Sequence, residues 1–151
     1  MKIIVDADAC PVKAEIAEAA VKYGVPAVMV ASYDHRIDPA EGVTVVQVDR
    51  SDQSVDLYIA NRVSPGDVLI TQDFGLAAIG LAKRATVISN RGQIYTDRSI
   101  DFLLERRHEN AKARRGGHYG KGPKSFTDDD RRRFLQTLTK VLTCLQENET
   151  I

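Results

Sequence analysis

Short apolar runs that alternate with helical patterns constrain the fold of this 151-residue chain more than any other feature. The runs span residues 2–5, 26–31, 43–48, 67–71 and 85–88. They are largely apolar throughout, whereas a strand with one solvated face alternates apolar and polar residues. Because parallel strands need crossover helices, this alternation predicts a three-layer, Rossmann-like α/β fold with a mainly parallel sheet covered on both faces.

Helical patterns separate these runs. In the first, apolar residues recur at helical spacing from Val12 to Tyr23. Pro11 suits the first turn of that helix and Gly24 suits its end. We expect two further crossover helices, at residues 54–63 and 74–84.

The last third of the chain predicts two longer helices joined by a glycine-rich loop at residues 116–123. In the helix from Ser99 to about Arg115, we expect Ile100, Leu103 and Leu104 to face inward. Thr127 is a suitable N-cap for the final helix, and Asp128, Asp129 and Asp130 then favour the positive end of its dipole. An apolar stripe on that helix predicts packing in the core or across a homodimer: Phe134, Leu135, Leu138, Val141, Leu142 and Leu145. We therefore expect one domain over residues 1–151, with an α/β core to about residue 98 and a helical C-terminal extension from about residue 99.

Charge is balanced overall, with 21 basic and 21 acidic residues, but it is unevenly distributed. A stretch from residue 111 to 127 holds no acid at all and five basic residues, namely Lys112, Arg114, Arg115, Lys121 and Lys124. Such a stretch, with glycines that let the backbone approach, suits contact with nucleic-acid phosphates, and Tyr119 or Phe126 could stack on a base. The alternative is a solvated helix end followed by a linker.

Cysteine usage indicates a reducing compartment. Cys10 and Cys144 lie far apart and form no metal-binding spacing, so both thiols are expected to be free. The sequence shows neither a signal-peptide pattern nor an apolar run of the ~20 residues that span a bilayer. We therefore expect a cytoplasmic protein with no membrane partner. Cys10 would lie near a helix N-terminus, where a buried turn residue is favoured over a reactive thiol.

Aspartates follow several of the predicted strands. Asp6 and Asp73 each come at a strand end and before a helix, and Asp56 lies in the first turn of the helix at 54–63. The carboxyl ends of parallel strands share one edge of the sheet, so these carboxylates should gather there. Oxygen ligands without His or Cys suit Mg²⁺ or Mn²⁺, which would promote phosphate-ester hydrolysis.

The same aspartates have a structural interpretation, because Asp commonly caps helices and forms turns. Asp8, Asp49 and Asp52 are nearby candidates for which a capping or turn role is favoured. Asp56 could cap or bind metal. The gathering of several carboxylates at one edge, and not any single residue, predicts the metal site.

Two passages carry a family resemblance. The helix Asp56-Leu57-Tyr58-Ile59-Ala60-Asn61, followed by a strand that runs into Thr71-Gln72-Asp73-Phe74-Gly75-Leu76, resembles the PIN-like nuclease domain. The whole chain more closely resembles the YaiI/YqxD family of uncharacterised bacterial proteins, through residues 5–11, 71–77 and 114–123. The PIN resemblance implies that Asp6, Asp56 and Asp73 hold the metal that cleaves RNA. From its position Asp8 is a further candidate ligand, and from their charge Arg114, Arg115, Lys121 and Lys124 are expected to contact phosphates.

The chain departs from the PIN pattern in its acids. It has no unique match for the acid of the central helix, and Phe74-Gly75-Leu76 stands where another acid often follows. A nucleic-acid-binding module without turnover is therefore the alternative hypothesis. Asp6-Ala7-Asp8 also resembles the Asp-x-Asp motif of haloacid-dehalogenase phosphatases, but the segment at 71–73 supplies neither the Lys nor the acidic pair that they need.

Overall fold

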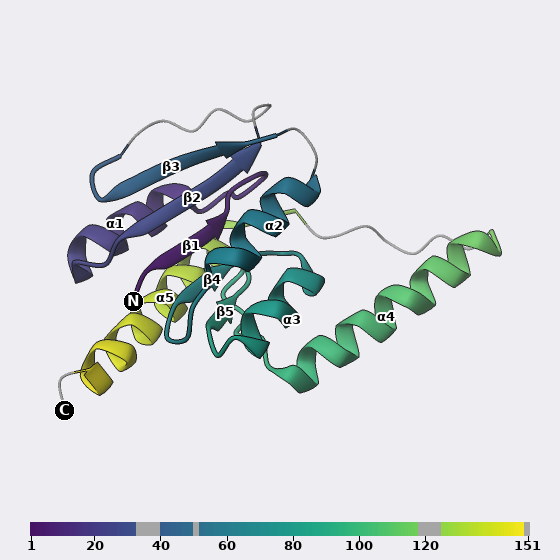
Figure 1. Ribbon diagram of the computed structural model, residues 1–151. Helices are drawn as coiled ribbons and strands as arrows, with labels where there is room; N and C mark the ends of the chain where they lie inside the picture. The colour runs from purple at the N-terminus through teal and green to yellow at the C-terminus, as the bar shows by residue number, and fades with distance from the viewer. Residues whose placement is uncertain (33–39, 50–51, 118–124, 150–151) are drawn as a thin grey trace.

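A computed structural model describes residues 1–32, 40–49, 52–117 and 125–149 of the chain (Figure 1). Its elements, in chain order, are β1 (Ile3–Asp6), α1 (Lys13–Tyr23), β2 (Ala27–Ser32), β3 (Val43–Val48), α2 (Asp52–Arg62), β4 (Val68–Ile70), α3 (Phe74–Ala82), β5 (Thr86–Ile88), α4 (Asp97–Arg115) and α5 (Asp128–Glu149). The strands form one sheet in the order β3-β2-β1-β4-β5, and every neighbouring pair is parallel. The predicted three-layer α/β fold is confirmed.

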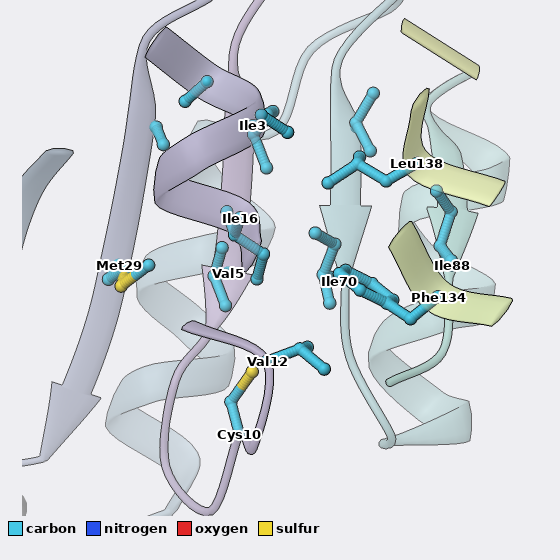
Figure 2. Close-up of a cluster of buried hydrophobic side chains, with 14 of the residues drawn as sticks. Ile3, Val5, Cys10, Val12, Ile16, Met29, Ile70, Ile88, Phe134 and Leu138 are labelled. Atoms are coloured by element: carbon cyan, nitrogen blue, oxygen red, sulfur yellow. The ribbon is translucent and has the colours of Figure 1, made fainter. Parts of the chain in front are cut away.

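Both faces of the sheet are buried, which explains why its central strands are apolar throughout. Ile3 and Val5 of β1 belong to a cluster shared with α1 and α5, whereas Ile4 between them belongs to a second cluster shared with α2 and α3. Figure 2 shows the first cluster, in which Phe134 lies beside Ile70. Neither face is left for water, so alternation with polar residues would be costly.

Helix α5 completes one of the two helical layers. Its residues Phe134, Leu138 and Leu142 are fully buried in the first cluster. The predicted apolar stripe therefore packs within the core of the chain, although Leu135 lies outside both clusters and is only partly buried. No helix among the described residues is long and apolar enough to cross a membrane.

Helix α4 extends away from the sheet, past α3 (Figure 1). Ile100 is buried and Leu103 is half-buried, as predicted, but Leu104 is exposed, so its predicted inward position is wrong. Only a narrow face at the start of α4 packs against α3 and the second cluster, and Leu104 lies outside that face. Phe102 is 63 % exposed on the same helix.

Two predicted helix starts are also corrected. Helix α1 begins at Lys13, so Pro11 lies in the turn before it and not in its first turn. The Pro11 carbonyl instead accepts a hydrogen bond from Arg131 of α5 (2.7 Å). Helix α2 begins at Asp52, which places Asp56 in the second turn.

Candidate functional site

The carboxyl ends of β1 and β4 lie side by side at the middle of the sheet, a position that we call the crevice. The two strands are neighbours, and the helices that follow them cover opposite faces: α1 packs in the first cluster and α3 in the second. Figure 1 shows the two helices on either side of the sheet. Adjacent crossovers that leave to opposite faces create the position where ligands bind in open α/β sheets.

A threonine joins the Asp6 carboxylate to the backbone of Asp73, the other predicted strand-end residue. The Thr71 hydroxyl donates to Asp6 Oδ2 (3.0 Å) and accepts from the backbone N–H of Asp73 (3.0 Å). The Asp6 carboxylate and the Asp73 backbone N–H thus both form a hydrogen bond with the same Thr71 oxygen. The structure brings these two predicted site residues together, through a residue whose role was not predicted.

Asp73 is also the N-cap of α3. Its Oδ1 atom accepts from the backbone N–H of Leu76 (3.2 Å), which fixes the carboxylate at the positive end of the helix. A Cβ atom added to Gly75 would lie 3.2 Å from this oxygen, closer than most side chains pack. The glycine therefore leaves room beside Oδ1.

Asp8 holds the loop between β1 and α1 against β2. Its two carboxylate oxygens accept from the backbone N–H of Ser32 at 3.0 and 3.3 Å. The following residue, Ala9, has φ 58°, in the left-handed region that side chains rarely adopt. Strain of this kind persists only where surrounding contacts impose it. Asp8 lies in the turn after β1, but these hydrogen bonds reach a distant strand, and both its expected capping or turn role and its metal role stay predictions.

The remaining acids lie apart from a shared centre. Asp56 is half-buried on α2 and Asp49 is exposed directly after β3. Among the described residues, no three Asp, Glu, His or Cys side chains lie close enough to hold one metal ion. Asp6 and Asp73 are therefore not joined by Asp56 or Asp8 in a three-carboxylate group. Metal binding by any of these residues stays a prediction.

Cys10 lies buried below the crevice. Its Sγ atom contacts Asn90 Oδ1 at 3.7 Å, and the Asn90 backbone N–H donates to Gln72 Oε1 (2.8 Å). Burial raises the pKa of the Cys10 thiol, outweighing the opposing effects of a backbone hydrogen bond and of Lys13. Both cysteines are free, as predicted, and Cys10 is the buried turn residue that was expected. Its contacts link the loops after β1, β4 and β5.

Two arginines border the same edge and are held by ion pairs. Arg131 binds Glu15 Oε1 (2.9 Å), and Arg91 binds Asp130 Oδ2 (2.6 Å). Their guanidinium carbons lie 5.3 and 5.7 Å from the centre of the Phe126 ring, within cation–π distance. These contacts anchor the start of α5 to the loops after β1 and β5.

The predicted phosphate-binding residues are only partly described. Arg114 and Arg115 are exposed at the end of α4, whereas Lys121 and Lys124 lie outside the described residues. A groove of about 310 Å³ runs beside Arg114, lined by Phe74, Leu103, Arg106, Arg107, Asn110 and Arg114. We call it the arginine groove. Phe74 directly follows Asp73, so the groove begins next to the crevice. The basic stretch of the sequence predicted a positive charge in this region, but no sequence pattern predicted that Phe74 lies beside it.

Comparison with known proteins places the chain among bacterial relatives. The profile of the family described as "Uncharacterized BCR, YaiI/YqxD family" matches residues 4–144. A UPF0178 protein of Bacillus pumilus is 46 % identical over 143 residues, which cover 93 % of this chain and 85 % of the relative. A UPF0178 protein of Listeria welshimeri is 43 % identical over 141 residues, covering 93 % of this chain and 95 % of the relative. No solved structure matches the chain.

Proposed function

The chain belongs to the YaiI/YqxD family, and from that premise we propose that it is a divalent-metal-dependent nuclease acting on RNA. The observation that carries the proposal is the pair Asp6 and Asp73, joined through Thr71 at the crevice between β1 and β4. One hydroxyl thus holds the Asp6 carboxylate and the Asp73 backbone together at a ligand-binding position of the sheet, and helix capping alone does not require this link.

The donor set fits Mg²⁺ or Mn²⁺. Mg²⁺ usually keeps several waters and takes one or two protein carboxylates plus phosphate oxygens of the substrate. The two carboxylates Asp6 and Asp73 would meet that need without a third. When bound, the ion would lower the pKa of a coordinated water and neutralise charge on the phosphate.

The chain's own residues would orient these ligands. Thr71 donates to Asp6 Oδ2, and this hydrogen bond would orient the Asp6 carboxylate at the end of β1. Leu76 holds Oδ1 of Asp73 through its backbone N–H, and Gly75 leaves the space beside that oxygen open. This preorganisation would reduce the reorganisation needed when charge develops on the phosphate.

The test is cleavage of end-labelled single-stranded RNA with Mg²⁺, Mn²⁺ or EDTA. Asp6→Asn and Asp73→Asn should each lower the metal-dependent rate by about two orders of magnitude or more. Asn also caps helices, so Asp73→Asn should keep the start of α3. Asp101→Asn, which removes an exposed carboxylate on α4, is the matched control and should cleave like wild type.

A nucleic-acid-binding module without turnover is the second candidate. It is favoured by the lack of three clustered carboxylates among the described residues. Wild-type protein that binds RNA tightly but leaves it intact with both metals would establish this alternative and refute the nuclease proposal.

A further inference from the structure

The arginine groove lies on one face of α4. That face starts with the residues that touch the layer beneath, Ile100 and Leu103, and continues at helical spacing through Arg107, Asn110 and Arg114. The acids of α4 lie on the opposite side, at Asp101, Glu105 and Glu109. The helix therefore presents a basic face toward Phe74 and a face of mixed charge, which also holds Arg98 and Lys112, away from it.

The arginines of the groove form no ion pair with the described residues, although Arg106 also lines a neighbouring hollow with Glu105 and Glu109. No carboxylate of the described residues lies within ion-pair distance of Arg106, Arg107 or Arg114, in contrast to Arg91 and Arg131. Like charges that converge on one groove repel each other unless an anion neutralises them. Arg is the side chain that best matches phosphate, through its planar fork of donors. The groove is thus complementary to a polyanion.

Phe74 adds an aromatic surface to this charge. Its ring is half-buried and held edge-on by Tyr95, with centroids 6.1 Å apart and an interplanar angle of 73°. Aromatic side chains beside basic grooves stack on the bases of single strands, whereas paired bases in a duplex are not accessible to them. The ligand is therefore expected to be single-stranded.

We propose that the arginine groove binds single-stranded RNA, with Arg106, Arg107 and Arg114 on phosphates and Phe74 on a base, and that it leads the strand to Asp73. The proposal rests on the proposed function for the nature of its ligand. It adds the path of the substrate and its strandedness. Asp73 is adjacent to Phe74 in the chain, so a strand held in the groove would pass beside the crevice.

The test measures binding of fluorescein-labelled single-stranded RNA in EDTA, where neither metal nor cleavage is needed. Arg107→Ala/Arg114→Ala should weaken binding at least about tenfold, because each lost contact is a charge-assisted hydrogen bond. The salt dependence should also fall, by roughly 0.7 in the slope of log K against log salt for each contact. Arg98→Ala/Lys112→Ala removes the same charge from the opposite face and should change the affinity by less than about threefold.

Phe74→Leu tests the aromatic contact while keeping an apolar side chain in place. It should weaken binding of single-stranded RNA by about fivefold or more, since stacking on one base is worth about 1–3 kcal/mol. Circular dichroism spectra of each variant verify that the fold is kept. Duplex RNA of the same length should bind more weakly to wild type.

Several outcomes would overturn the proposal: no binding by wild type, equal weakening in both double variants, or equal affinity for duplex and single strand. The two proposals fail separately. Metal-dependent cleavage with unchanged binding in Arg107→Ala/Arg114→Ala would refute the groove and leave the nuclease. Groove-dependent binding without cleavage would refute the nuclease and leave the groove.

Discussion

The two long helices of the C-terminal third, α4 and α5, use the same residue types in opposite ways. In α5, Phe134, Leu138 and Leu142 are fully buried, and Arg131 at its start is paired with Glu15. In α4, only Ile100 is buried, and the arginines of the groove have no carboxylate partner among the described residues. One helix completes the core, while the other displays charge.

The difference shows that arginine content alone does not identify a binding surface. Arg131 stabilises the turn before α1, so its charge is already neutralised. Arg107 and Arg114 gain a neutralising partner only from outside the described part of the chain. A helix that is polar nearly all round gains little from burial, and a bound partner would explain why Arg107 and Arg114 share one face of it.

The largest difference expected between α5 and α4 is in how much each helix contributes to the free energy of unfolding. Phe134→Ala should lower the free energy of unfolding by about 3–5 kcal/mol, because it removes a fully buried ring and leaves a cavity. Phe102→Ala on α4 should change it by no more than about 0.5 kcal/mol, since that ring is exposed. Urea unfolding followed by circular dichroism measures both. Equal effects would show that α4 is packed in solution.

A smaller contrast is expected at the helix starts, where each helix has a threonine cap. Thr127 accepts from the backbone N–H of Asp130 (3.1 Å), and Thr96 accepts from that of Ser99 (3.1 Å). Thr127→Ala should reduce global stability by about 1 kcal/mol. Thr96→Ala should instead fray α4 with less effect on global unfolding, because few of its residues pack on the core.

Hydrogen exchange of the α4 amides measures local fraying, and urea unfolding measures global stability. A global loss of stability from Thr96→Ala as large as that from Thr127→Ala would contradict the expectation that α4 frays without unfolding the core.

The smallest expected effect is on the pH dependence of stability, through Asp130 at the start of α5. The hydrogen bond from the Thr127 backbone N–H lowers the pKa of Asp130, with help from the Thr127 hydroxyl and from Arg91 and against the effect of burial. A lowered folded-state pKa contributes stability above the ordinary value near pH 4, which is lost as the pH falls through the folded-state value. The Tm of wild type should therefore fall more steeply below about pH 4 than that of Asp130→Asn. Identical slopes would contradict this role, and Asp101→Asn controls for the loss of one carboxylate.

Most of the fold could be predicted because its signals are local. The predicted strand at Val43–Val48 matches β3, and the other strands differ only at their ends. The start of α1 was misplaced because the turn around Pro11 is held by contacts distant in sequence, such as Arg131 of α5. Leu104 was misplaced because periodicity marks an apolar face but not how far along a helix that face is covered.

The site was predictable only in outline. Topology placed Asp6 and Asp73 on one edge, since parallel strands share their carboxyl ends. The link through Thr71 depends on the register of β1 against β4, which pairs Val5 with Ile70, and no local pattern encodes it. The arginine groove likewise depends on how α4 lies against α3, which side-chain periodicity does not specify.

The central position of β1 has a consequence for folding during synthesis. Residues 3–6 are made early, but β4 beside them comes more than sixty residues later, and the α5 side chains that cover Ile70 and Ile88 come near the end of this chain. Until α5 emerges from the ribosome, one apolar face of the sheet remains partly open. Such a nascent chain is prone to aggregate and is a natural client for chaperones.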